Sequence, residues 1–257
     1  MTAPSLLGRP LWHELLTTDI DAATHFYTAV VGWTVSDSTG LGYEYKIWNR
    51  PGGGAVGGVM RLPAGLEAPP HWVMYIGVSS LEEAVAAIET RGGRALSPVI
   101  DVPDVGRLRT MLDPQGAMFS VYQPSAPITE PEQESQPGDL SWRELYTTDA
   151  AAAKAFYFDV FGWTDAGSSD MGPMGTYHMF GRTFPLGGMM TKVGDMVTLP
   201  NAWGLYFMVP DVAGAVERVK TGGGTVLNGP MEVPGGSTIA QCLDPQGAAF
   251  ALHQPAS

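Results

Sequence analysis

An internal duplication constrains the fold of this 257-residue chain more than any other feature. Residues 12–34 recur as residues 142–164, 130 positions later, with 14 of 23 positions identical. Further matches follow in the same order, since Gly57-Gly58-Val59-Met60 returns as Gly187-Gly188-Met189-Met190 and the Asp-Pro-Gln-Gly turn at Asp113 returns at Asp244. Self-similarity at a fixed period indicates repeated structural units, and two copies of one domain are therefore predicted.

A segment rich in proline and acidic residues separates the two copies. Residues 124–139 contain four prolines, four acidic residues and one large apolar residue. Such a composition cannot bury a core and is typical of an extended linker. The predicted organisation is a first domain at 1–124, a linker at 125–139 and a second domain at 140–257.

Apolar periodicity predicts the order strand, helix and three strands twice in each copy. In the first copy a strand at 11–17 leads into Asp19, a good helix N-cap, and the helix ends at Gly32, where a left-handed backbone suits glycine. Ser80 and Glu83 form a capping box for the second helix. Further strands are predicted at 43–48, 55–61, 72–78, 95–99, 107–112 and 118–122. The predicted fold class is α+β, with four βαβββ units in two homologous halves.

Composition excludes several classes of function. The net charge is −12 and no basic stripe is visible, which argues against nucleic acid and membrane surfaces as partners. No apolar run is long enough to span a membrane, and no signal peptide is recognised. The only cysteine, Cys242, excludes an internal disulfide. We expect a cytoplasmic protein that acts on small molecules, as a pseudo-dimeric monomer or a homodimer.

The sequence resembles the vicinal oxygen chelate superfamily, which includes glyoxalases, bleomycin-resistance proteins and extradiol dioxygenases. The resemblance rests on the first strand running into Thr-x-Asp, the Phe-Tyr-x-x-x-x-Gly-Trp helix end, the Gly-Gly strand and the Asp-Pro-x-Gly turn. It covers both halves nearly end to end, excluding the linker. It implies glyoxalase-like domains in which paired βαβββ units curl a mixed sheet into a cupped cavity. Familiar members hold a divalent metal there with His and Glu side chains.

The positions that correspond to the family's metal ligands carry other residue types here. They are Trp12 and Trp142 on the first strands, Val73 and Gly204 on the fifth strands, and Ser120 and Ala251 on the last strands. Metal binding needs convergent N, O or S donors. We therefore predict that the protein uses neither a metal nor another cofactor.

Glu14 and Glu144 are the candidate catalytic residues. Each follows a tryptophan by two positions, so that both share the strand face expected to line the cavity. Desolvation among Trp, Met and Tyr would raise the pKa of such a carboxyl group and suit it to general acid or base chemistry. Alternatively, both glutamates are structural hydrogen-bond acceptors. His13 and Arg143 point to the opposite face, toward solvent or the interface between the halves.

Aromatic residues and methionines are predicted to form the cavity wall. The chain contains seven Trp, nine Tyr, nine Phe and 13 Met. Cavities lined by such side chains bind flat or hydrophobic ligands. The predicted ligand-binding residues are Trp12, Tyr45, Met60, Tyr75, Met111, Ser120, Tyr122, Trp142, Tyr177, Met189, Tyr206 and His253. Ordinary core packing is the alternative explanation for about half of them.

Three classes of function remain open at this point. The first is a metal-independent protein of the glyoxalase and bleomycin-resistance type that binds a hydrophobic or aromatic small molecule. The second is a metal-free lyase, isomerase or hydroxylase with Glu14 or Glu144 as general base. The third is a regulatory protein with vestigial cavities. The sequence does not decide which cavity works, or whether the βαβββ units pair within or across the halves.

Overall fold

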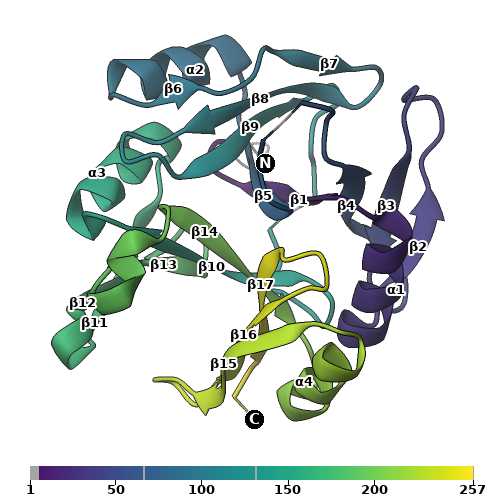
Figure 1. The fold of residues 1–257 in the computed structure, drawn as a ribbon. Coiled ribbons are helices and arrows are strands. Elements are labelled where there is room, and N and C mark those ends of the chain that lie inside the picture. The colour runs from purple at the N-terminus through teal and green to yellow at the C-terminus, as the bar shows by residue number, and fades with distance from the viewer. Residues whose placement is uncertain (1–5, 66, 131, 257) are drawn as a thin grey trace. The chain divides into compact units, whose positions relative to one another are not determined.

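The computed structural model describes residues 6–65, 67–130 and 132–256 (Figure 1). The helices in these ranges are α1 (Ile20–Val31), α2 (Leu81–Thr90), α3 (Ala150–Phe161), α4 (Val212–Thr221) and the short 3-10 helices η1 (Gly172–Met174) and η2 (Gly194–Thr198). The strands of the first half are β1 (Pro10–Thr17), β2 (Thr34–Asp37), β3 (Tyr45–Asn49), β4 (Ala55–Arg61), β5 (His71–Gly77), β6 (Arg94–Ala95), β7 (Ile100–Val102), β8 (Gly106–Leu112) and β9 (Met118–Pro124). The strands of the second half are β10 (Leu140–Thr147), β11 (Thr164–Asp170), β12 (Thr176–Gly181), β13 (Pro185–Thr191), β14 (Ala202–Met208), β15 (Thr225–Glu232), β16 (Thr238–Leu243) and β17 (Ala249–Gln254).

The predicted α+β class is confirmed, with one curled mixed sheet for each half of the chain. The first βαβββ module has the strand order β2-β3-β4-β1, in which β1 and β4 are parallel and the other neighbours antiparallel. The third module repeats this order as β11-β12-β13-β10. The second and fourth modules have the orders β6-β8-β9-β5, with β7 also paired to β8, and β15-β16-β17-β14.

The predicted helix ends are confirmed. Asp19 accepts a hydrogen bond from the amide of Ala22 and caps α1, which ends at Gly32 with the left-handed φ of 88°. Ser80 caps α2 by accepting from the amide of Glu83. These ends were predictable because capping is a local interaction between residues three or four positions apart.

The strands differ from the prediction at two places. β2 was not predicted, because its residues are polar and mostly exposed and therefore lack the apolar alternation of a half-buried strand. The predicted strand at 95–99 is wrong, since β6 ends at Ala95 and β7 begins at Ile100. Pro98 lies in the gap, and proline has no amide hydrogen to donate to a sheet.

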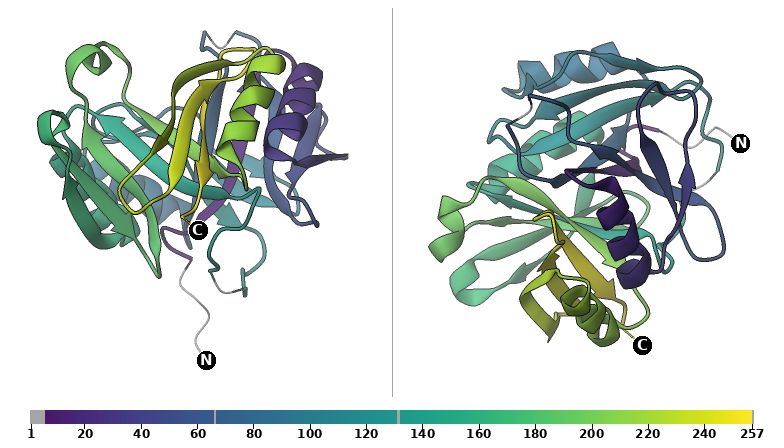
Figure 2. Two further views of the ribbon diagram at one scale, coloured as in Figure 1. Left: turned by 90° about the horizontal axis from the view of Figure 1, so that it is seen from below. Right: turned by 45° about the vertical axis from the view of Figure 1, so that its right-hand side comes forward.

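The chain forms two compact units, and each unit combines modules from different halves. One unit contains Met74–Glu134 and Arg143–Trp203, and the other contains Trp12–Val73 and Gly204–Ser257. Within the second of these units α1 lies beside α4, and within the first α2 lies beside α3 (Figures 1 and 2). Each module therefore packs its helix against the helix of a module from the other half. The sequence did not decide between pairing within and across the halves.

A buried tyrosine links the two modules of the unit that contains α1 and α4. The Tyr27 hydroxyl donates to a carboxylate oxygen of Asp244 at 3.2 Å and accepts from the indole N–H of Trp72 at 3.0 Å. The Tyr27 ring also packs edge-on against Phe250, with 5.2 Å between ring centroids. The Phe-Tyr helix motif of one half and the Asp-Pro-Gln-Gly turn of the other thus form one core.

The unit that contains α2 and α3 repeats this arrangement. The Tyr157 hydroxyl donates to Asp113 at 3.1 Å and accepts from the Trp203 indole at 3.0 Å. Phe119 packs against the Tyr157 ring with a centroid distance of 5.6 Å. Both copies of the tyrosine motif therefore serve the contact between modules of different halves.

The predicted linker is anchored to the folded chain at several points, one of which is Glu132. Glu132 accepts from the guanidinium of Arg182 at 3.3 Å and from the Thr183 hydroxyl at 3.1 Å. The Glu132 and Arg182 side chains are only 12% and 14% exposed. An ion pair at this depth is screened less than a surface pair and holds the segment in place.

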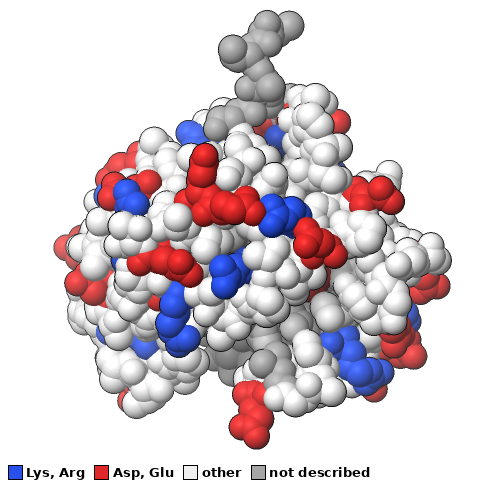
Figure 3. All heavy atoms as spheres, turned by 90° about the horizontal axis from the view of Figure 1, so that it is seen from above, with Lys and Arg blue, Asp and Glu red and all other residues white. Residues whose placement is uncertain are grey.

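Charges on the molecular surface are mixed. On the face seen in Figure 3, the described Lys and Arg side chains lie among Asp and Glu and form no continuous basic patch. None of the helices in the described residues is long and apolar enough to span a membrane.

Candidate functional site

Strand β1 divides its side chains between two environments, because successive residues of a strand point to opposite faces. His13, 3% exposed, faces the helix-covered core, where its ring centroid lies 5.2 Å from that of Phe207 in the other half. His13 thus occupies the interface between the halves. Arg143 does not face solvent either, because it is buried and its guanidinium donates to the carbonyl of Leu186 at 3.3 Å. Glu14 points away from this core. The face of β1–β4 that carries Glu14 is termed the first glutamate face, and the face of β10–β13 that carries Glu144 the second glutamate face.

Indole, phenol and carboxylate form a hydrogen-bonded chain on the first glutamate face. The Trp12 indole N–H donates to the Tyr45 hydroxyl at 3.0 Å, and the Tyr45 hydroxyl is hydrogen-bonded to Glu14. Burial, the charge of Glu14 and this hydrogen bond raise the pKa of Tyr45 far above its ordinary value. Tyr45 is therefore a protonated donor at neutral pH. Met60, opposite Tyr45 in the strand pairing, completes this face.

The glycine pair of β4 makes room for side chains on both faces of the strand. Gly58 is the pairing partner of Glu14, and a Cβ atom there would lie 1.9 Å from the Tyr45 hydroxyl oxygen. A Cβ atom at Gly57 would lie 2.6 Å from the His13 ring on the opposite face. Gly58 is thus required so that the Tyr45 side chain can cross the strand beside Glu14, and Gly57 leaves room for the His13 ring.

The second glutamate face repeats this arrangement. Glu144, 8% exposed like Glu14, pairs with Gly188. A Cβ atom at Gly188 would lie 2.2 Å from the Tyr177 hydroxyl oxygen, so that Tyr177 crosses this glycine beside Glu144. Trp142 is half-buried and lies two positions before Glu144 on the same face of β10.

The second glutamate face carries a tyrosine where the first carries a leucine. Tyr146 follows Glu144 by two positions, and its hydroxyl donates a hydrogen bond to the Glu144 carboxylate. The corresponding position of the first half is Leu16, which carries no polar group. Tyr146 was not predicted as a site residue.

Two predicted residues of the fourth module lie in a polar cluster of their own. Tyr206 is adjacent to Ala251 in the strand pairing, and its hydroxyl accepts from the Gln241 amide at 2.9 Å. His253 lies with its Nδ1 atom 2.8 Å from the Ser141 hydroxyl. Burial lowers the pKa of His253, which favours the neutral imidazole at pH 7.

The second module brings together three of the predicted residues. Tyr75, 7% exposed, pairs with Ser120, whose hydroxyl lies 3.1 Å from that of Thr110. Tyr122 lies two positions further along the same face of β9, and its hydroxyl donates to the carbonyl of Val105 at 2.9 Å. This face is therefore lined by hydroxyl groups rather than by charges.

Two methionines predicted to line the cavity are core residues instead. Met111 is fully buried and pairs with Phe119, which belongs to the helix-covered core. Met189 is also fully buried and pairs with Leu145. The residue after it, Met190, points to the second glutamate face. A position error of one residue places a strand side chain on the wrong face.

Four residues of these clusters were missed, namely Ser141, Tyr146, Met190 and Gln241. Tyr146 could have been found from its period-two spacing to Glu144, and Met190 from the register of the duplication, which aligns it with Met60. Ser141 and Gln241 have no local signal. Their contacts depend on the pairing of strands distant in sequence.

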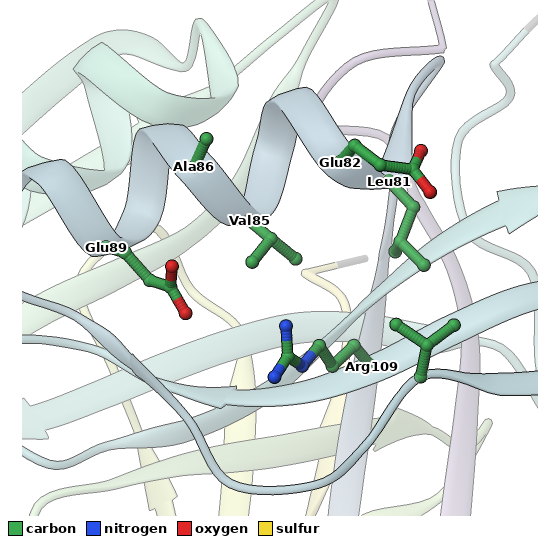
Figure 4. A pocket seen from close by; sticks show the side chains of 7 residues that line it. Leu81, Glu82, Val85, Ala86, Glu89 and Arg109 are labelled. Atoms are coloured by element: carbon green, nitrogen blue, oxygen red, sulfur yellow. The ribbon is translucent and has the colours of Figure 1, made fainter.

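A shallow groove opens on the helix side of the second module (Figure 4). It has a volume of about 250 Å³ and is lined by Leu81, Glu82, Val85, Ala86, Glu89, Val99 and Arg109. Arg109 pairs with the core residue Val121, so that the groove lies on the helix-covered face of the sheet. None of the predicted site residues lines it. The candidate site therefore lies on the glutamate faces, where the buried carboxylates Glu14 and Glu144 are.

The side chains on the glutamate faces do not fit the divalent metal of familiar family members. The Trp12 indole N–H is a hydrogen-bond donor to Tyr45 and offers no lone pair to a metal. Within the described residues, no group of three or more His, Cys, Asp or Glu side chains is arranged to hold a metal ion. Glu14 or Glu144 alone does not supply the convergent donors that a transition metal needs.

Two family models together match most of the chain. Residues 140–252 match the Glyoxalase/Bleomycin resistance protein/Dioxygenase superfamily, and residues 13–122 match a glyoxalase-like domain. The fold and both matches agree with the resemblance noted in the sequence. The chain belongs to the glyoxalase/bleomycin resistance protein/dioxygenase superfamily, which is the vicinal oxygen chelate superfamily, as a member with two homologous halves.

Individual relatives cover nearly the whole chain. "Putative glyoxylase CFP32" of Mycobacterium tuberculosis is 33% identical over 254 residues, which are 97% of this chain and 95% of CFP32. "Anthracycline biosynthesis protein DauV" of Streptomyces sp. (strain C5) is 29% identical over 261 residues, which are 95% of this chain and 92% of DauV. The Mn(II)-bound glyoxalase of Novosphingobium aromaticivorans has the same fold, with a TM-score of 0.65 and 17% identity over 98% of this chain and 84% of that chain.

Proposed function

We propose that the protein binds a hydrophobic or aromatic small molecule on its glutamate faces without the help of a metal ion. The observation that carries this proposal is the carboxylate hydrogen-bonded to a tyrosine beside a tryptophan and a methionine, as in Glu14, Tyr45, Trp12 and Met60. A flat ligand would stack on the indole and thioether groups and present one polar hydrogen to the glutamate.

The names of the relatives support an aromatic ligand. DauV is named for anthracycline biosynthesis, and so is DnrV of Streptomyces peucetius, which is 30% identical over 258 residues. Anthracyclines contain a flat fused-ring system. The indole of Trp12 and the thioether of Met60 are groups that pack well against a fused aromatic ring.

The metal-independent part of the proposal rests on the chemistry of the donors. Each glutamate face offers one carboxylate surrounded by phenol and indole groups, which donate hydrogen bonds instead of ligating cations. The glutamate of this arrangement is suited to accept a hydrogen bond or a proton from the ligand.

A metal-free enzyme is the second candidate, favoured by the burial of Glu14 and Glu144. Both residues are only 8% exposed, and a carboxylate shielded from bulk water can take a proton from a bound ligand without competition from solvent. In this case Glu14→Gln or Glu144→Gln would lower turnover by about 10²- to 10⁴-fold while ligand affinity changes little. The same substitutions in a binding protein would weaken affinity instead.

The proposal is tested by calorimetric titration of 2-methoxynaphthalene into protein that has been dialysed against EDTA. We expect saturable binding, and about tenfold weaker binding in the double variant Trp12→Ala/Trp142→Ala because the stacking surface is lost. Leu227→Ala is the control, since Leu227 is an exposed apolar residue of β15, a strand that belongs to neither glutamate face. No saturable binding, or binding only after Zn²⁺ is added, would contradict the proposal.

A further inference from the structure

We infer that the second glutamate face selects ligands with a free phenolic or enolic hydroxyl group, and that Tyr146 sets the strength of this selection. The inference rests on the proposed function and adds the ligand's polar group and a specificity-determining residue. It follows from the hydrogen bond that the Tyr146 hydroxyl donates to the Glu144 carboxylate.

The Glu144 carboxylate accepts a hydrogen bond from the Tyr146 side chain. Glu144 and Tyr146 lie two positions apart on β10, so that both side chains share one face. The hydrogen-bonded group that Tyr146 presents is a phenol. A phenolic ligand would present the same donor on the same kind of ring, so the Tyr146 side chain shows which ligand chemistry this carboxylate accommodates.

The two glutamate faces share three of the residues around the carboxylate. The tyrosine that crosses the glycine, the glycine itself and the preceding tryptophan are the same in both halves, because Tyr45, Gly58 and Trp12 correspond to Tyr177, Gly188 and Trp142. The exchange of Leu16 for Tyr146 adds a polar group to this otherwise matched set. It is therefore a position at which recognition of a hydroxyl group by the glutamate would differ between the halves.

The Tyr146 hydroxyl would compete with a ligand hydroxyl for the Glu144 carboxylate. A ligand hydroxyl that donates to Glu144 must displace or share the position of the Tyr146 hydroxyl, so that part of the gain is cancelled. Removal of the Tyr146 hydroxyl should strengthen binding of a phenol and leave an ether unaffected, since an ether has no hydrogen to donate. A charge-assisted hydrogen bond of this type changes affinity by roughly tenfold to a hundredfold.

The experiment measures the ratio of the Kd values for 2-methoxynaphthalene and 2-naphthol by calorimetry at pH 7. All variants carry Glu14→Gln, so that the first face contributes no charged acceptor. In this background we expect the ratio to favour 2-naphthol by less than about fivefold, and Tyr146→Phe to increase this preference about tenfold. Glu144→Gln should bring the ratio close to one. Tyr146→Leu, which installs the residue of the first half, should reproduce the effect of Tyr146→Phe.

The outcomes separate this inference from the function on which it rests. A ratio that is unchanged by both Tyr146→Phe and Tyr146→Leu, in variants whose thermal midpoint matches that of Glu14→Gln alone, would overturn the inference and leave the proposed function standing. Equal affinities for the two probes in every variant would do the same. Absence of binding of both probes to the wild-type protein would instead overturn the proposed function.

Discussion

Replacement of Tyr27 by Phe should destabilise the protein by about 2–4 kcal/mol. The Tyr27 hydroxyl is fully buried and links the indole N–H of Trp72 to the carboxylate of Asp244. Leaving a buried polar group without its partner costs about 1–3 kcal/mol. The Trp72 indole loses its only acceptor in this contact. Asp244 keeps its hydrogen bonds from the amides of Gln246 and Ala248, so that its share of the destabilisation lies near the lower limit of about 1 kcal/mol.

The assay is urea denaturation followed by tryptophan fluorescence. Tyr157→Phe should have an effect similar to that of Tyr27→Phe, because Tyr157 makes the same two contacts with Trp203 and Asp113. Tyr122→Phe is the control, since the Tyr122 hydroxyl is less buried and has a single carbonyl partner; it should cost less than about 1 kcal/mol. Losses below about 1 kcal/mol for both Tyr27→Phe and Tyr157→Phe would refute the view that these tyrosines hold the halves together.

Three further predictions address other parts of the molecule. Gly58→Ala should displace the Tyr45 side chain and cost about 1–3 kcal/mol of stability through overpacking, measured by urea denaturation; an unchanged midpoint would contradict the role given to this glycine. Burial lowers the folded-state pKa of His253, so its contribution is present above the unfolded pKa near 6.5 and is lost as the pH falls below it; His253→Gln should lose less stability between pH 7 and pH 5 than the wild type does. Glu132→Gln should accelerate proteolytic cleavage of residues 125–139 by about tenfold because the partly buried pair with Arg182 is broken, and equal cleavage rates would exclude this anchor.

Local chemistry made much of the fold predictable. The N-caps at Asp19 and Ser80 and the left-handed Gly32 depend on residues a few positions apart, and the structure confirms them. The contact between Tyr27 and Asp244 joins residues 217 positions apart. No local rule specifies which of four similar modules will share a core, and the packing across the halves therefore had to come from the structure.

The candidate site was predictable where strand alternation alone decides the outcome. Alternation from a tryptophan placed Glu14 and Glu144 on the face opposite the core, and the structure adds their tyrosine partners. It failed for Met111 and Met189, because a shift of one residue moves a strand side chain to the other face. Tyr146 was not predicted because its counterpart in the first half is Leu16, so that the duplication does not mark this position as polar.

The most direct test of the account follows the tryptophan indole signals of ¹⁵N-labelled protein by NMR during titration with 2-methoxynaphthalene in the presence of EDTA. Trp12 and Trp142 lie on the glutamate faces, whereas Trp33 and Trp163 are buried and donate to the backbone carbonyls of residues 138 and 8. Replacement of each tryptophan by Phe assigns the signals. We predict that the Trp12 signal, the Trp142 signal or both shift saturably while those of Trp33 and Trp163 stay in place. Shifts confined to other tryptophans, or shifts that require added Zn²⁺, would contradict a metal-independent aromatic site on the glutamate faces.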